Sequence, residues 1–188
     1  MSTPPADGSP DNDSSETSSQ HVEQSWATPT HAEIVEITKG HVAGMEASDA
    51  DPVWLIAGMQ HVMLRTVGRK TGNVHKVALP TWNDSDGVRV VVGSFAGHDK
   101  NPSWFTNLAD SAANPEVYCR VQGGAFWSAP EVLTGSERDH AWAGLVADRP
   151  WYNDYQAKTS RPIPLVRLPE TRPATPGVVA APTPDEVL

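Results

Sequence analysis

The chain has 188 residues, a net charge of −9, 38% hydrophobic residues and one cysteine. This length suggests one domain, the acidity argues against a nucleic-acid-binding protein, and a single cysteine excludes an intramolecular disulfide. The sequence shows no signal peptide and no apolar run of membrane-spanning length. We therefore expect a soluble, cytoplasmic protein without a transmembrane segment. Peripheral membrane contact is still compatible with this composition.

Both ends of the chain have the composition of disordered segments. Residues 1–29 are rich in Ser, Thr, Pro and Asp, and residues 169–188 are rich in Pro and Ala. Neither segment has enough apolar side chains to offset the entropy that a chain loses on folding. We predict a disordered acidic tail over 1–29, one folded domain over 30–168 and a disordered tail over 169–188.

The first half of the predicted domain combines two helices with short strands. Thr30 and Glu33 have the spacing of a capping box and open a helix over 30–44. Short β-branched or apolar stretches predict strands over 53–57, 61–66, 74–82 and 88–94. Asn101 and Pro102 then have the residue types of a helix cap and a first helical residue.

The second half of the predicted domain begins with a hairpin. Gly123 and Gly124 separate two strand-like stretches, over 116–122 and 125–133. A second capping-box pattern at 134–137 opens a helix that stops before Pro150, and a short helix over 151–159 and a strand over 163–168 follow. Short connections favour antiparallel pairing, so we predict a mainly β fold of the α+β class: a small barrel or highly curved sheet with peripheral helices.

A basic turn interrupts the acidic chain. Residues 60–82 hold no Asp or Glu but carry Arg65, Arg69, Lys70 and Lys76. Two apolar runs flank the turn, so its cationic side chains would project from a rigid sheet, although a merely solvated hairpin would show the same pattern. Small residues precede the predicted helix start at Pro102, where free backbone N–H groups and the positive end of the helix dipole also favour an anion. Together they favour a phosphate-bearing cofactor.

Other patterns are weaker or missing. Tyr152 and Tyr155 are three residues apart, which puts both rings on one side of a helical turn, where core packing is the simpler explanation. The seven histidines and one cysteine lack metal-site spacing, so no metal is expected. No G-x-G-x-x-G, Walker or G-x-S-x-G motif supports a Rossmann, P-loop or hydrolase reading.

From about residue 31 to 168 the sequence resembles the deazaflavin-dependent nitroreductase family, whose members use coenzyme F420. The matching segments are residues 66–72, 86–92, 100–108, 114–117, 133–138, 154–156 and 161–164. The resemblance implies a split β-barrel, similar to FMN-binding proteins, and a coenzyme held by its phosphate and polyglutamate tail. It also implies hydride transfer from the reduced deazaflavin to a small-molecule electron acceptor such as a quinone, an enone or a nitroaromatic compound.

Carried onto this sequence, the resemblance implies a set of site residues. Those expected to bind the coenzyme are Arg69, Lys70, Thr71, His75, Lys76, Gly93, Ser94, Lys100, Asn101, Pro102 and Trp104. The residues expected to act in catalysis, by a hydrogen bond to the acceptor oxygen, are Ser94, Tyr152 and Tyr155. His75 or Lys76 would replace a phosphate-binding arginine that the family often has after the second glycine of the turn.

Two alternatives stay open from the sequence. One is the same barrel with bound FMN. The other is a non-catalytic protein that binds a cofactor or a lipid-like molecule, which the apolar Pro80 and Phe95 favour because relatives often carry aromatic and polar residues there. The sequence indicates neither the physiological acceptor nor the oligomeric state.

Overall fold

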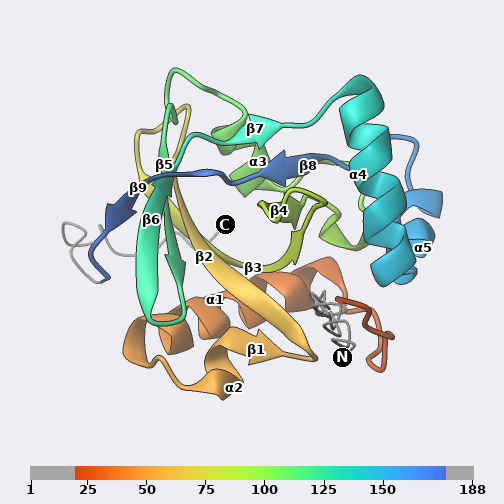
Figure 1. The fold of residues 1–188 in the computed structure, drawn as a ribbon, viewed down its shortest axis with the longest axis horizontal. Helices are drawn as coiled ribbons and strands as arrows, with labels where there is room; N and C mark the ends of the chain where they lie inside the picture. The colour runs from red at the N-terminus through yellow and green to blue at the C-terminus, as the bar shows by residue number, and fades with distance from the viewer. Residues whose placement is uncertain (1–19, 177–188) are drawn as a thin grey trace, which may run out of the picture.

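The computed structural model describes residues 20–176, and within this range nine strands form one antiparallel sheet. The strands are β1 (Leu55–Ile56), β2 (Met59–Val67), β3 (Val74–Asn83), β4 (Arg89–Val92), β5 (Val117–Val121), β6 (Gly124–Ser128), β7 (Glu131–Val132), β8 (Leu165–Arg167) and β9 (Glu170–Ala174). Their order is β7-β8-β4-β3-β2-β5-β6-β9, and β1 pairs with β2. The sheet curves into an open half-barrel (Figure 1), so the predicted split β-barrel is confirmed.

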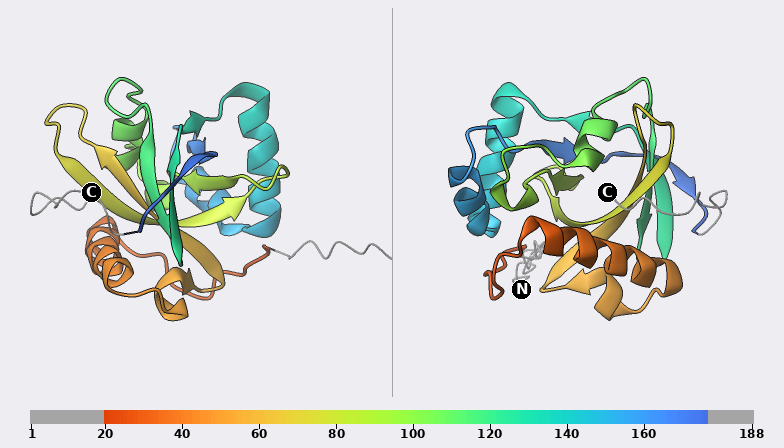
Figure 2. Two further views of the ribbon diagram at one scale, coloured as in Figure 1. Left: turned by 60° about the vertical axis from the view of Figure 1, so that its left-hand side comes forward. Right: turned by 180° about the vertical axis from the view of Figure 1, so that it is seen from behind.

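Helices surround this sheet, as the sequence predicts. They are α1 (His31–Ala47), α2 (Asp51–Trp54), α3 (Ser103–Leu108), α4 (Gly135–Asp148) and α5 (Trp151–Ala157), with the 3-10 helix η1 (Phe95–Gly97). In Figure 2, α1 and α2 lie across one side of the sheet and α4 and α5 stand together at another. No helix in the described part of the chain is both long and apolar enough to cross a membrane.

The strand β2 organises the core because it pairs with β3 on one edge and β5 on the other. Its alternate residues face two different clusters. Val62 and Leu64 pack inside the barrel with Trp104 of α3, whereas Met63 packs on the opposite face with Met45 of α1. A third cluster lies beneath α4 and α5.

The capping box at the start of α1 is confirmed. Thr30 Oγ1 accepts a hydrogen bond from Glu33 N at 3.3 Å, and Thr30 N donates to Glu33 Oε2 at 2.7 Å. The helix runs to Ala47, three residues past its predicted end. The second predicted capping box is wrong, because Thr134 is the N-cap of α4 but its side chain makes no capping hydrogen bond.

Two further local predictions are corrected. The apolar stretch 53–57 is not one strand, because Pro52 stands in the first turn of α2 and only Leu55–Ile56 continue as β1. Asn101 does not cap α3. Pro102 is the N-cap residue, and the Asn101 side chain accepts a hydrogen bond from Arg161 instead.

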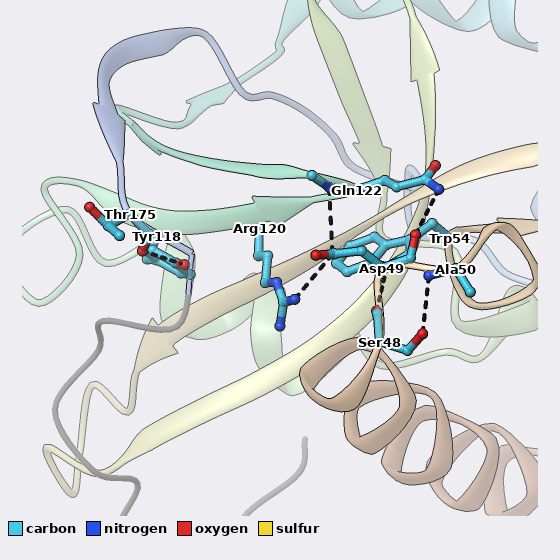
Figure 3. A network of polar contacts seen from close by, with 9 residues as sticks. Ser48, Asp49, Ala50, Trp54, Tyr118, Arg120, Gln122 and Thr175 are labelled. Carbon is cyan, nitrogen blue, oxygen red and sulfur yellow. Dashed lines mark hydrogen bonds and ion pairs between the residues drawn. The ribbon is translucent and has the colours of Figure 1, made fainter.

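The loop between α1 and α2 is tied to the β5–β6 hairpin (Figure 3). Asp49 accepts a hydrogen bond from Arg120 Nη2 at 3.1 Å, and Gln122 Nε2 donates to Asp49 O at 2.9 Å. The buried Trp54 lies under the same guanidinium, 5.4 Å from its ring centroid to Arg120 Cζ. These contacts fix the loop between α1 and α2 against the β5–β6 hairpin.

The folded part extends beyond both predicted boundaries. β9 pairs with β6 after residue 168, where the sequence predicts a disordered tail. Before residue 30, Gln20 exchanges two hydrogen bonds with the Asn83 backbone, at 2.8 and 2.7 Å, and Val22 N donates to Asp148 O at 2.9 Å. Composition misses such segments because backbone hydrogen bonds hold them. The remaining parts of both predicted tails, 1–19 and 177–188, lie outside the described residues.

Candidate coenzyme and acceptor site

A cavity of about 470 Å³ opens between α1, α3 and α5. It borders the outer edge of β3. Residues 74–80 of that strand pair with β2, but β4 pairs only with 81–83, so no strand within residues 20–176 covers the outer edge of 74–80. Side chains from both faces of β3, including Leu79 and Pro80, therefore line the cavity. An open strand edge also offers unpaired backbone N–H and C=O groups to a ligand.

Five of the predicted site residues line this cavity: Ser94, Pro102, Trp104, Tyr152 and Tyr155. They come from the loop after β4, from the start of α3 and from α5. Sequence segments about sixty residues apart therefore meet at one place. Trp104 is 3% exposed and packs on the barrel core, so its ring is both a wall of the cavity and part of the interior.

The loop after β4 has a strained backbone. Phe95 and Ala96 have φ of 47° and 52°, the left-handed region that costs a non-glycine residue about 1–2 kcal/mol. Gly97 follows with φ of 85°, and a Cβ there would lie 2.5 Å from Tyr155 O. The conformation therefore depends on close contact between this loop and α5.

Arg161 holds that loop in place. Its guanidinium donates to Ser94 O and His98 O, both at 2.8 Å, and to Asn101 Oδ1 at 2.9 Å. On the other side, the His31 ring at the start of α1 packs against His98, with centroids 4.1 Å apart. Burial, and then the neighbouring His98, lower the pKa of His31. Arg161 lies in one of the family-like segments, but no sequence pattern indicates this role.

The two tyrosines of α5 form the aromatic end of the cavity. Their rings meet edge to face, 5.8 Å apart, and Trp151 stacks on Tyr152 at 5.6 Å. Trp26, from the segment before α1, also lines the cavity and meets Trp151 at 5.3 Å. Burial raises the pKa of Tyr152, an effect that the nearby Arg149 opposes. At neutral pH the Tyr152 hydroxyl is therefore a hydrogen-bond donor.

Two histidines face the same cavity. His61 Nδ1 lies 2.9 Å from Met59 O, and its ring is 4.8 Å from that of His41. Burial, with His41 as a smaller cause, lowers the pKa of His61 to about 4. His61 is therefore neutral at physiological pH, which keeps charge out of this wall.

The basic turn lies at the other end of the open β3 edge. Gly72 N and Thr71 N donate to Gly68 O, at 2.7 and 3.2 Å, and Arg69 Nη1 donates to Thr106 Oγ1 of α3 at 3.3 Å. A Cβ on Gly68 would lie 2.7 Å from Thr71 Oγ1, so the tight turn requires glycine there. Arg69, Lys70 and Thr71 are all exposed.

The structure separates His75 from Lys76. They are adjacent on β3 and therefore point to opposite faces of the sheet. Lys76 forms an ion pair with Glu46 of α1. His75 lies beside the turn, since a Cβ on Gly68 would be 2.8 Å from His75 Nε2. Of the two predicted phosphate ligands, Lys76 is thus already engaged by a carboxylate.

The remaining predicted residues lie around the site without lining the cavity. Gly93 packs on Pro164, and a Cβ there would lie 2.6 Å from Pro164 Cγ, so its glycine serves strand packing. Lys100 and Asn101 are exposed on the loop that Arg161 holds. Within residues 20–176, no group of three His, Cys, Asp or Glu side chains could bind a metal ion.

The residues present fit a ligand with an anionic part and an aromatic ring. The turn supplies exposed cations, and the cavity supplies aromatic walls. His75, Val77 and Leu79 share one face of β3, so the two ends are roughly 13 Å apart at the usual rise of a strand. One extended molecule can therefore reach both along the open edge.

Comparison with known proteins identifies a family. The family model described as F420H(2)-dependent quinone reductase matches residues 37–170. The F420H(2)-dependent quinone reductase Rv1261c of Mycobacterium tuberculosis (strain ATCC 25618 / H37Rv) is 32% identical over 112 residues, which cover 57% of this chain and 71% of that protein. The protein MT1299 of Mycobacterium tuberculosis (strain CDC 1551 / Oshkosh), of the same description, matches equally.

A solved structure described as an F420-H2 dependent reductase, FDR-A, is 33% identical to this chain. The match covers 58% of this chain and 93% of that one, with a TM-score of 0.49. The family match confirms the resemblance found in the sequence and the coenzyme that it implies. Because the family model spans residues 37–170, the chain belongs to the F420H(2)-dependent quinone reductase family of oxidoreductases, whose coenzyme is F420.

Proposed function

We propose that the protein transfers a hydride from reduced F420 to an electrophilic acceptor bound in the cavity. A quinone is the acceptor that the family description favours, and enones and nitroaromatic compounds belong to the same reactivity class. The observation that carries the proposal is the open β3 edge, which has exposed cations at one end and an aromatic cavity at the other. A binding site of this shape would orient an extended coenzyme.

The exposed turn is the proposed site for the anionic part of the coenzyme. Arg69 and Lys70 would supply charge, and Thr71 and the backbone would supply hydrogen bonds. His75 is the better candidate for the missing family arginine, because Lys76 is paired with Glu46. Lys100 and Asn101 would lie beside the coenzyme on the second loop, and Gly93 would act only by shaping it.

In the cavity, the protein's task is to place the acceptor against the ring of the coenzyme and to exclude water. Trp104 and Pro102 would pack against the ring system, and the chemistry that the bound coenzyme supplies is a hydride. Hydride addition to the acceptor moves an electron pair onto the acceptor oxygen. Among the hydroxyl groups that line the cavity, we propose Ser94, Tyr152 and Tyr155 as the donors of a hydrogen bond to that oxygen.

The second proton of a hydroquinone product need not come from the protein, because solvent can supply it. Catalysis here therefore means positioning and charge stabilisation rather than obligatory proton transfer. Tyr155→Phe should lower turnover with a quinone more than it changes coenzyme affinity, since the ring packing remains and the hydroxyl is lost. A variant that loses affinity and keeps turnover would place Tyr155 with the coenzyme instead.

The direct test follows oxidation of reduced F420 by the purified protein with a panel of quinones, enones and nitroaromatic compounds. Steady turnover with a quinone is expected. The absorption spectrum of the protein as purified and its titration with FMN test the flavin alternative. Tight coenzyme binding without turnover of any acceptor would instead support a non-catalytic binding protein, the alternative that the apolar Pro80 and Phe95 favour.

A further inference from the structure

Arg149, between α4 and α5, is a buried cation that the proposed chemistry does not yet use. The residue is 3% exposed, and its Nη2 donates to Thr81 O at 2.6 Å. Its Nε and Nη1 make no hydrogen bond to any residue from 20 to 176. Burying a charge with unmatched N–H groups costs stability, so structural support alone is a poor reason for arginine at this position.

The contacts of Arg149 place its charge behind the cavity. Tyr152, a cavity residue, donates its backbone N–H to Arg149 O at 3.2 Å, and its phenol is close enough for the guanidinium to affect its ionisation. His61, another cavity residue, also experiences the Arg149 charge. Thr81 directly follows Pro80, which lines the cavity. Arg149 itself lines a neighbouring cavity together with Thr81 and His61, and His61 lines both cavities, so the guanidinium lies behind the wall that they share.

The neighbouring acid does not fully use this charge. The Asp148 carboxylate accepts a hydrogen bond from Trp82 Nε1 at 2.7 Å, and its charge influences the Arg149 guanidinium without forming a hydrogen bond to it among the described residues. A second buried arginine shows the contrast. Arg120 of β5 is 8% exposed and is paired with Asp49 of the α1–α2 loop at 3.1 Å (Figure 3).

We propose that Arg149 is a positioning residue for acceptor reduction, which polarises and orients the Tyr152 hydroxyl toward the acceptor oxygen. As hydride arrives at the acceptor carbon, an electron pair moves to that oxygen, and the Tyr152 O–H donates to it. A fixed cation behind the phenol strengthens this donation in a site of low dielectric, without moving a proton itself. The inference depends on the proposed function, because it needs an acceptor in the cavity.

The test is a double-mutant cycle in which Arg149→Met and Tyr152→Phe are combined, with saturating reduced F420 and a naphthoquinone. Arg149→Met should lower kcat about tenfold and leave coenzyme affinity within about twofold. In the Tyr152→Phe background the same change should cost less than about twofold, because the group through which it acts is gone. A full tenfold loss in that background, or no loss in the single variant, would overturn the proposal.

Two controls separate this role from structural damage. Arg120→Met removes a buried arginine of the other network and should lower stability while kcat stays unchanged. Arg149→Lys keeps the positive charge and should lose less kcat than Arg149→Met. Equal losses in the two Arg149 variants would contradict a role for the charge. Arg149→Gln, which also removes the charge, can replace Arg149→Met in the cycle if the latter does not fold.

A binding measurement gives a readout that needs no turnover. A fluorinated nitrophenol, followed by fluorine NMR with oxidised F420 present, reports how strongly the site favours the phenolate over the phenol. At one fixed pH, the bound probe should be less ionised in Arg149→Met than in the wild type, and unchanged ionisation would contradict the proposal. Absence of quinone turnover in the wild type would instead refute the proposed function.

Discussion

The two ends of the site are built in opposite ways. The basic turn, residues 68–72, is a single exposed segment held mainly by its own backbone hydrogen bonds. The cavity has mostly apolar and aromatic walls, which come from the segment before α1, from α1 itself, from β3 and the loop after β4, and from α3 and α5. An exposed cationic turn can change affinity for an anion, whereas a preorganised cavity can also act on charge that develops during a reaction.

This difference predicts a division of effects. Changes in the turn should weaken coenzyme binding in a salt-dependent way and leave the fold intact. Changes in the cavity should affect stability, pH dependence and turnover. Four substitutions with different expected effects on stability or binding test this division.

The largest effect is expected from Arg161→Met at the cavity end. The variant loses three charge-assisted hydrogen bonds that hold Ser94, His98 and Asn101. The strained loop should lose its conformation, at a cost of about 4 kcal/mol in unfolding free energy, after allowance for the partial exposure of the guanidinium. Denaturant unfolding measures this loss.

The matched control is Arg89→Met. Arg89 makes one ion pair, with Glu170 at 2.7 Å, and its guanidinium lies over the Phe126 ring, 5.2 Å from the centroid; its loss should cost no more than about 2 kcal/mol. If both variants had the same stability, the hydrogen bonds of Arg161 would not stabilise the loop after β4. The basic turn and this loop would then not differ in their dependence on distant residues.

The next effect concerns pH and the buried His61. Its pKa is about 4 in the folded protein and near 6.5 when exposed, so the unfolded chain binds the extra proton between these values. The neutral form favours folding: stability is complete above pH 6.5 and is lost as pH falls toward 4, by roughly 3 kcal/mol in total. Denaturant unfolding at several pH values measures the slope.

His61→Leu should reduce the change of unfolding free energy with pH between about 6.5 and 4, because the buried group that must stay neutral is absent. The exposed His140 of α4 provides the control, and His140→Gln should leave the slope unchanged. A slope that persists in His61→Leu would show that other groups control the acid sensitivity of the fold.

A smaller effect is expected at the turn. Lys70→Ala should weaken binding of oxidised F420 about tenfold, which corresponds to a charge-assisted contact of about 1.4 kcal/mol. Stability should be unchanged, since Lys70 is exposed. Lys39→Ala, on α1 outside both the turn and the cavity lining, should not affect binding. Equal coenzyme affinity in Lys70→Ala and the wild type would remove Lys70 from the site.

The smallest effect is expected from Trp26→Ala. The Trp26 ring closes one side of the cavity against Trp151. Its removal should raise the KM for a bulky quinone about threefold, in line with about 0.5–1 kcal/mol for one aromatic contact, and should leave coenzyme affinity unchanged. A selective loss of coenzyme binding would instead place Trp26 beside the ring of F420.

Much of this architecture could be predicted from the sequence, because it follows from local signals. The β-branched stretch of β4, the glycines of the β5–β6 hairpin and the capping box of Thr30 each specify their own conformation. The basic turn was also visible, since its charges are adjacent in the chain. Local patterns do not predict a side-chain contact with a residue far along the chain. Asn101 has the residue type of a helix cap, but its side chain accepts a hydrogen bond from Arg161 instead.

The walls of the cavity could be predicted only in part. Tyr152 and Tyr155 are candidates through the family resemblance, whereas Trp26 lies in a segment with the composition of a tail, and Arg149 carries no motif. Their roles arise from burial and from contacts across more than sixty residues, such as Arg149 with Thr81. No periodicity or spacing rule encodes such contacts.

We expect one coenzyme molecule to bind along the open edge of β3, with its anionic part on the basic turn and its ring in the cavity. Calorimetric titration with oxidised F420, and with the same deazaflavin lacking phosphate and glutamates, tests this most directly. F420 should bind the wild type at least about tenfold more tightly than the truncated deazaflavin, and Lys70→Ala should reduce that difference. No heat with F420, or equal affinity for the two compounds, would contradict the account.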